Sequence, residues 1–269
     1  MYRLLALDLD GTLLRRDHSV DERDVAAIRE VQRAGVTVTI ATGRLQSGAV
    51  SAARACGIEG AIACMEGSHL VELASNTTLL QHPIEAETSA LLRQILGANG
   101  HAQFVFDAQG IHHDHAGAPY AHYVSTWSPN LRIVEEDVAW QTAPLAAVAI
   151  GEEGAVAAAA EALRAHANRL FSVSFQVWTI AGKHAVLARA AGPNKGTALR
   201  ELCARVGCTP AEAVVVGDWM NDIPMFEVAG RSFVMGGAPE AISSKATDQL
   251  GAASGGGGGI AEAIRRAWG

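Results

Sequence analysis

The sequence predicts an α/β protein with a Rossmann-like parallel sheet, interrupted by a second segment of α+β type. Three observations lead to this prediction. Short apolar runs alternate with amphipathic stretches in the first 64 residues, the alternation stops in the middle of the chain, and it returns after Gly192-Pro193. Alternating strands and helices are typical of parallel sheets with right-handed crossovers.

In the first part, we expect strands at 3–8, 36–41 and 60–64 and helices at 21–34 and 46–56. The first helix places Val25, Ile28 and Val31 on one face, and Gly35 is its expected C-cap. The resulting βαβαβ order predicts three parallel strands.

The middle of the chain mixes hairpins with helices, which predicts a separate α+β module. After a hairpin at 69–73 and 77–81, we expect helices at 85–97 and 153–167 and strands near 103–107, 111–114, 145–150, 171–178 and 184–190. We therefore expect a core domain at 1–83 and 190–269, with an inserted domain at 84–189.

The last part predicts helices at 195–206, 222–229 and 260–267 and strands at 213–216 and 233–235. Five consecutive glycines, Gly255 to Gly259, are expected to form a mobile loop. The run lacks the Gly-Lys-Ser/Thr ending of a phosphate-binding P-loop.

Composition excludes several classes of function. The 269 residues carry a net charge of -7 and no run of lysines or arginines, which argues against nucleic acid or an anionic membrane as partner. No stretch is apolar enough for a membrane helix, and the N-terminus is too short and acidic for a signal peptide. We expect a cytoplasmic protein, monomeric or a small homo-oligomer. The four cysteines form no Cys-x-x-Cys pair, so we expect buried thiols and no zinc site.

Asp8-Leu9-Asp10-Gly11-Thr12 directly follows the first apolar run. Two carboxylates at the end of a buried strand repel each other unless positive charge lies between them. A bound divalent cation, together with a reaction that uses the carboxylates, accounts for the pair.

Asp8, Thr42 and Asp218 each follow a predicted strand, so they should meet at the carboxyl edge of the sheet. Lys195 begins a helix, where backbone N–H groups favour an anion, and a lysine there makes sense if it faces a negatively charged ligand. This set suits phosphoryl transfer through an aspartyl phosphate, with one carboxylate as nucleophile and another as acid and base. Mg²⁺ prefers such oxygen ligands.

Four motifs resemble those of the haloacid dehalogenase superfamily phosphatases of the Cof type, subfamily IIB, which carry a C2 cap domain. The motifs are Asp8-Leu9-Asp10-Gly11-Thr12-Leu13-Leu14, Ala41-Thr42-Gly43-Arg44, Asn194-Lys195-Gly196-Thr197-Ala198-Leu199 and Gly217-Asp218-Trp219-Met220-Asn221-Asp222-Ile223-Pro224-Met225. Two positions depart from the family pattern, because Glu66-Gly67 and Gly237 stand where Asn-Gly and Asn are usual.

The resemblance implies Asp8 as nucleophile and Asp10 as general acid and base. It implies Mg²⁺ ligands from Asp8, the Asp10 carbonyl and Asp218, supported by Asp222. The residues implied to bind the phosphoryl group are Thr42, Gly43, Lys195 and Asn221.

The expected function is a Mg²⁺-dependent phosphatase for a small phosphorylated metabolite, with sugar phosphates first among the candidates. A phosphomutase or phosphotransferase with the same chemistry stays open, as does a catalytically silent module that binds a phosphorylated metabolite.

The inserted domain holds residues with no assigned role. We expect His112, His113 and His115 to be polar surface residues, with a substrate contact or a metal site as alternatives. Trp127, Trp140 and Trp178 are expected to pack between cap and core, with stacking on a sugar as the alternative.

Overall fold

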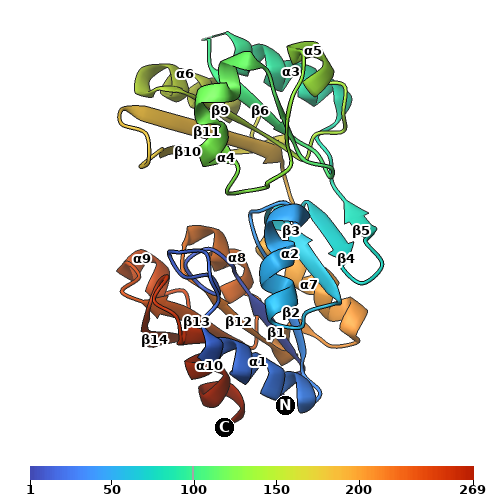
Figure 1. Cartoon of the computed structure of the whole chain (residues 1–269), viewed down its shortest axis with the longest axis vertical. Coiled ribbons are helices and arrows are strands. Elements are labelled where there is room, and N and C mark those ends of the chain that lie inside the picture. The colour runs from blue at the N-terminus through green and yellow to red at the C-terminus, as the bar shows by residue number, and fades with distance from the viewer. Residues whose placement is uncertain (99) are drawn as a thin grey trace. The chain divides into compact units, whose positions relative to one another are not determined.

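The computed structural model describes residues 1–98 and 100–269. The chain divides into two compact units, each of which is described by itself. The first unit contains residues 1–43, 49–80 and 193–269, and the second contains residues 44–48 and 81–192 (Figure 1).

A five-stranded parallel sheet forms the centre of the first unit. The chain runs from β1 to the edge strand β2 on one side, and the later strands β12, β13 and β14 extend the sheet on the other side. This order is that of a doubly wound sheet, and it confirms the predicted fold class. The strands in sheet order are β14 (Asp248–Ala253), β13 (Arg231–Gly236), β12 (Ala213–Gly217), β1 (Leu4–Leu7) and β2 (Thr37–Ile40).

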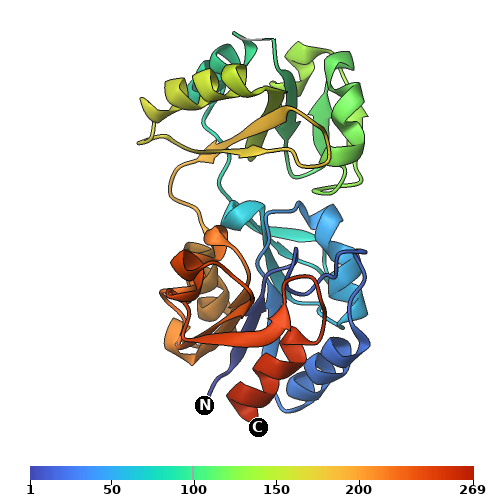
Figure 2. The ribbon, with the colours of Figure 1, turned by 90° about the vertical axis from the view of Figure 1, so that its left-hand side faces the viewer.

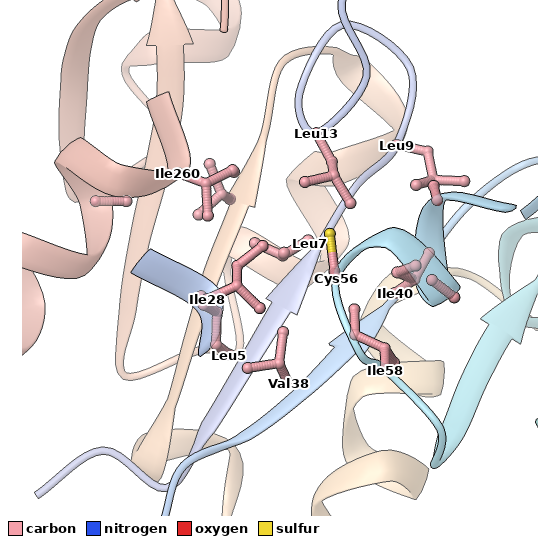
Figure 3. Close-up of a cluster of buried hydrophobic side chains, with 14 of the residues drawn as sticks. Leu5, Leu7, Leu9, Leu13, Ile28, Val38, Ile40, Cys56, Ile58 and Ile260 are labelled. Atoms are coloured by element: carbon pink, nitrogen blue, oxygen red, sulfur yellow. The ribbon is translucent and has the colours of Figure 1, made fainter. Parts of the chain in front are cut away.

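Helices cover both faces of this sheet, because β1 is apolar on both sides. Leu5 and Leu7 pack under α1, α10 and the part of α2 from Ala49 onward, as Figure 3 shows for Ile28, Ile260 and Cys56 beside them. Leu4 and Ala6 pack on the opposite face under α7, α8 and α9. These helices are α1 (Glu22–Arg33), α2 (Gln46–Ala55), α10 (Gly259–Trp268), α7 (Lys195–Val206), α8 (Ile223–Phe226) and α9 (Glu240–Ser243).

The third predicted strand belongs to a second, smaller sheet. β3 (Ala61–Cys64) pairs antiparallel with β4 (His69–Glu72), and β5 (Thr77–Gln81) completes a separate three-stranded sheet. One parallel bridge, Ala41–Ala63, links β3 to the end of β2. The third predicted strand is thus bridged in parallel to the end of β2, and it also pairs with the following hairpin, which the sequence did not indicate.

The five glycines form a turn that packs closely against α1, whereas their composition predicted a mobile loop. Gly255, Gly257 and Gly258 have positive φ, and a Cβ on Gly257 would overlap the carboxylate of Asp21. The buried carboxylate of Asp24 accepts hydrogen bonds from the N–H groups of Gly258 and Ala261, both at 2.8 Å. Asp24 thereby fastens α1 to the beginning of α10, and Figure 2 shows these two helices side by side.

The second unit is built on a six-stranded sheet that is antiparallel except for the pair β7–β8. α3 (Ala86–Gly97) and α6 (Glu153–Arg164) pack against one face of it. The strands in sheet order are β10 (Leu170–Gln176), β11 (Lys183–Ala190), β9 (Ala146–Glu152), β6 (Ala102–Phe106), β7 (Ile111–His113) and β8 (Leu131–Ile133).

Several short elements were not predicted from the sequence, because each has few apolar residues and is held by its neighbours. In the second unit they are β8, α4 (Ala121–Val124), α5 (Glu136–Ala139) and a 3₁₀ turn at His115–Tyr120. In the first unit they are β14, α9 and 3₁₀ turns at Met65–Gly67, Pro210–Glu212 and Met220–Asp222.

The expected surface position is wrong for two of the three histidines. His112 and His113 lie on β7 between β6 and β8 and are buried. The Nε2 atom of His112 lies 2.8 Å from Oδ2 of Asp107, and Nδ1 of His113 lies 2.7 Å from the carbonyl oxygen of Asp114. His115 is exposed and lies beyond the end of β7, so it does not share a strand face with His113.

Two of the three tryptophans differ clearly in environment within the second unit. Trp127 packs edge-on against Phe106 and Tyr123, with ring centroids 5.8 and 5.3 Å away, whereas Trp178 is 84% exposed. The four cysteines are free thiols. Among the helices within residues 1–98 and 100–269, none is long and apolar enough to cross a membrane.

Replacing Asp24 with alanine should destabilise the first unit, because two N–H groups at the beginning of α10 lose their acceptor. We expect the Asp24→Ala variant to lose about 1–3 kcal/mol of unfolding free energy in urea titrations. Glu30→Ala, an exposed change on the same helix, should stay within about 0.5 kcal/mol of the wild type. Equal stability of the two variants would contradict this role for Asp24.

Candidate active site

The candidate site lies where the strand order of the first unit reverses, between β1 and β12. Asp8 directly follows β1 and Asp218 directly follows β12, and the N–H of Asp8 donates to the carbonyl oxygen of Val216 at 3.0 Å. One carboxylate oxygen from each of Asp8, Asp218 and Asp222 can be chosen so that all three lie within 4.8 Å of one another. Ligands of doubly wound sheets bind at such a switch point.

Glycine at position 11 lets the loop after β1 pass close to Asp218. Its φ is +79°, and a Cβ on this residue would overlap the Asp218 carboxylate. Asp10, one residue earlier, is exposed, in contrast to the buried Asp8, and its charge contributes to raising the pKa of Asp218. The two carboxylates of the first motif therefore occupy different environments.

Lys195 is a fully buried lysine between two carboxylates. It is the first residue of α7, whose start is fixed by the Asn194 side chain accepting from the N–H groups of Gly196 and Thr197 at 2.9 Å. Its Nζ donates to Oδ1 of Asp8 and, at 2.6 Å, to Oδ1 of Asp222. Burial alone would lower the pKa of Lys195, but the two carboxylates outweigh it and hold the pKa well above its ordinary value. Lys195 is therefore an ammonium ion.

Asp222 uses both of its carboxylate oxygens within the site. One accepts from Lys195, and the other accepts from the N–H groups of Asp218 and Trp219, at 2.8 and 3.0 Å. A Cβ on Gly217 would overlap this carboxylate, so glycine is needed at the end of β12. Asp222 therefore fixes both the lysine and the loop that carries Asp218.

Asp8, Asp218 and Asp222 together carry more negative charge than the single ammonium group of Lys195 can offset. Burial, reinforced by Asp222 and Asp218 and opposed by Lys195, raises the pKa of Asp8 well above its ordinary range. Burial likewise raises the pKa of Asp218 to about 6, against the hydrogen bond that it accepts from Ser254. A bound cation would offset this excess of negative charge.

The donor set fits a hard divalent cation such as Mg²⁺, because it offers oxygen atoms alone. Asp8 uses one carboxylate oxygen on Lys195 and Asp218 uses one on Ser254, which leaves each a second oxygen for a cation. An open hollow of about 150 Å³ lies beside Asp218, lined also by Trp219, Gly237, Pro239 and Ser254.

The remaining predicted residues gather around Glu66. Thr42, at the end of β2, is buried, and its carbonyl oxygen accepts from the N–H of Glu66 at 2.9 Å. Nδ2 of Asn221 donates to Oε1 of Glu66 at 2.9 Å, and Gly43 lies so close to the same oxygen that a Cβ there would be 2.7 Å away. The charge of Glu66 also acts on Lys195. All eight predicted site residues thus lie in the loops around the ends of β1, β2 and β12 and the start of α7.

Sequence reasoning missed the contacts of two residues at this edge. Glu66 was noted for its departure from the family pattern, but its contact with Asn221 was not foreseen. Met65 and Glu66 both have positive φ angles, of 47° and 56°. Ser254, whose Oγ donates to Oδ2 of Asp218 at 2.7 Å, was not noted at all. It follows β14, a strand that the sequence did not predict, so no signal marked its position.

Known proteins match this chain over most of its length. Residues 5–264 match the profile of the haloacid dehalogenase-like hydrolases. The chain is 28% identical over 246 residues to an HMP-PP phosphatase of Yersinia pseudotuberculosis serotype O:1b (strain IP 31758), covering 88% of this chain and 85% of the relative.

Solved structures show the same fold. A haloacid dehalogenase-like hydrolase from Bacteroides thetaiotaomicron superposes with a TM-score of 0.85 at 23% identity, over 99% of both chains. A subclass IIB sugar phosphatase of the same superfamily superposes with a TM-score of 0.79 at 17% identity, over 98% of both chains.

These findings confirm the resemblance that was based on the four motifs, including its Cof-type phosphatase character. The profile match extends over nearly the whole chain and includes all eight predicted site residues. The chain belongs to the haloacid dehalogenase-like hydrolase family.

Proposed function

We propose that this enzyme is a Mg²⁺-dependent phosphatase that hydrolyses a small phosphorylated metabolite through an aspartyl phosphate on Asp8. The observation that carries the proposal is the buried carboxylate of Asp8, held by Lys195 among acidic residues at the switch point of the sheet. Such a carboxylate is fixed in orientation, and it needs a cation before a phosphate dianion can approach it.

In the first half-reaction, a carboxylate oxygen of Asp8 attacks phosphorus and the bond from phosphorus to the leaving oxygen breaks. Asp10 donates its proton to that leaving oxygen. In the second half-reaction, Asp10 takes a proton from a water molecule, whose oxygen attacks the phosphorus of the aspartyl phosphate. Inorganic phosphate leaves, and the Asp8 carboxylate and the Asp10 acid are restored.

Burial separates the roles of the two carboxylates. Asp8 is buried and bonded to Lys195, whereas Asp10 is exposed and can exchange protons with water. Lys195, Thr42 and Asn221 are proposed to hold the phosphoryl oxygens. Mg²⁺, held by Asp8, Asp218 and the Asp10 carbonyl, would offset the repulsion between Asp8 and the phosphate dianion.

The proposed substrate is small and phosphorylated, with sugar phosphates as the first class. The names of two related proteins, an HMP-PP phosphatase and a sugar phosphatase, support this size and chemistry. We propose that residues 84–189 form the cap domain that selects the leaving group. This assignment agrees with a second unit that folds around its own core.

The nucleophile is tested by hydrolysis of p-nitrophenyl phosphate in the presence of Mg²⁺. Asp8→Asn should lower kcat by a factor on the order of 10³ or more, because an amide oxygen does not replace the attacking carboxylate. Glu30→Gln, which alters an exposed carboxylate on α1 of the same unit, should keep activity near that of the wild type. EDTA should abolish wild-type turnover and excess Mg²⁺ should restore it; equal rates for Asp8→Asn and the wild type would refute the role of Asp8.

The raised pKa of Asp218 predicts how the stability of the cation-free protein changes with pH. Its pKa is about 6 in the folded protein and about 4 in an unfolded chain, so the folded state binds this proton more tightly. Stability from this group is therefore complete below about pH 4 and is lost as the pH rises to about 6.

Asp218→Asn should remove that loss. In urea titrations with EDTA, the wild type should lose about 1–3 kcal/mol relative to the variant between pH 4 and pH 7. Parallel stability curves for the two proteins across this range would show that Asp218 ionises as an ordinary carboxyl group.

The substrate class is tested with a panel of phosphorylated metabolites. Sugar phosphates should give a higher kcat/KM than p-nitrophenyl phosphate, since contacts with the leaving group contribute to transition-state binding. Phosphorylated peptides serve as the large-substrate comparison and should be poor substrates. A preference for phosphopeptides over all small metabolites would contradict the proposed class.

A further inference from the structure

The turn between β14 and α10 carries the glycine run, which the proposed mechanism does not use. This turn is attached to the loop after β1, because the N–H of Gly255 donates to the carbonyl oxygen of Gly11 at 2.7 Å. The N–H of Arg16 donates back to the carbonyl oxygen of Gly255 at 3.3 Å, and Asp24 holds Gly258 at the other end. A glycine-rich segment is thus held at a defined place beside the first motif.

Ser254 begins this turn and contacts the candidate site directly. Its Oγ donates to Oδ2 of Asp218 at 2.7 Å, a contact that joins residues 36 positions apart in the chain. Serine hydroxyls in turns commonly bond to nearby backbone groups. This hydroxyl instead bonds to a carboxylate at the end of another strand.

The hydrogen bond between Ser254 and Asp218 is enclosed by the loop after β1. A Cβ placed on Gly11 would overlap both Oδ2 of Asp218 and Oγ of Ser254, so the first-motif backbone closes over the hydrogen bond. The backbone N–H of Asp218 is held as well, because it donates to Oδ2 of Asp222 at 2.8 Å. With its backbone and one oxygen fixed, the plane of the Asp218 carboxylate, and hence its second oxygen, is fixed too.

We propose that Ser254 is a positioning residue that sets the affinity of this protein for Mg²⁺ by orienting Asp218. The inference rests on the proposed function and extends it, because it assigns the turn after β14 to the cation site. The glycines fit this role: they let the turn pass close to Gly11 and Asp21, where a side chain would collide with Asp21. Partners of metal-bound carboxylates commonly control affinity in this way.

The test is a calorimetric titration of the full chain with Mg²⁺ alone, without substrate. Ser254→Ala should weaken Mg²⁺ binding about tenfold or more. The matched control is Ser232→Ala, which removes a buried hydroxyl that pairs with Thr247 at the opposite end of β13. The control should lose stability in urea while its Mg²⁺ affinity stays within about twofold of the wild type.

The outcomes separate this inference from the proposed function. If the wild type and Ser254→Ala bind Mg²⁺ equally, the role of Ser254 is overturned and the proposed function stands. If the wild type binds no Mg²⁺, both are overturned. Should the alanine variant not fold, Ser254→Cys keeps the side-chain volume with a weaker donor, and the same loss of affinity is expected of it.

Discussion

The site depends on one buried ammonium group held between two carboxylates. Lys195 has no exposed surface and bonds to both Asp8 and Asp222. Removing one partner from a buried ion pair leaves an uncompensated charge, so each of these three groups requires the others. Because Lys195 begins α7, Asp8 directly follows β1 and Asp222 follows β12, the ion pairs also link this helix to the ends of two strands.

Around Lys195, the backbone passes very close to the acidic side chains. Gly11 and Gly217 lie where a Cβ would overlap the carboxylates of Asp218 and Asp222, so glycine permits the acidic groups to crowd together. Burial in this crowded site raises the pKa of Asp8 and of Asp218, so the ionised form of each carboxyl group is disfavoured when no cation is bound. The same crowding brings together carboxylate oxygens, the ligands that the proposed Mg²⁺ would prefer.

The sequence was sufficient to predict the placement of residues whose position depends on local structure. Asp8, Thr42 and Asp218 directly follow apolar runs, and parallel strands bring their carboxyl ends together, so their meeting required little tertiary information. The helix predicted from Lys195 to Val206 has those bounds in the structure, because Asn194 caps its start and Gly207 ends it in a left-handed conformation. The doubly wound sheet followed from the same alternation.

Features that depend on distant pairing could not be predicted. β14 has a single fully buried apolar residue, Leu250, and it is held at the sheet edge by pairing with β13 and by the ion pairs of Asp248 with Arg231 and Arg266. Missing this strand meant missing Ser254 at its end. In the same way, the burial of His112 depends on β8, a strand of three residues with two of them exposed.

The proposed function depends above all on Asp8, which is proposed to carry the phosphoryl group during turnover. Acid quenching of the enzyme during hydrolysis of a phosphate ester with Mg²⁺, followed by mass spectrometry of its peptides, tests this most directly. We predict a hydroxylamine-sensitive phosphate on the peptide that contains Asp8, and its absence from the Asp8→Asn variant. Phosphate trapped on a different residue of the active wild type would contradict the account.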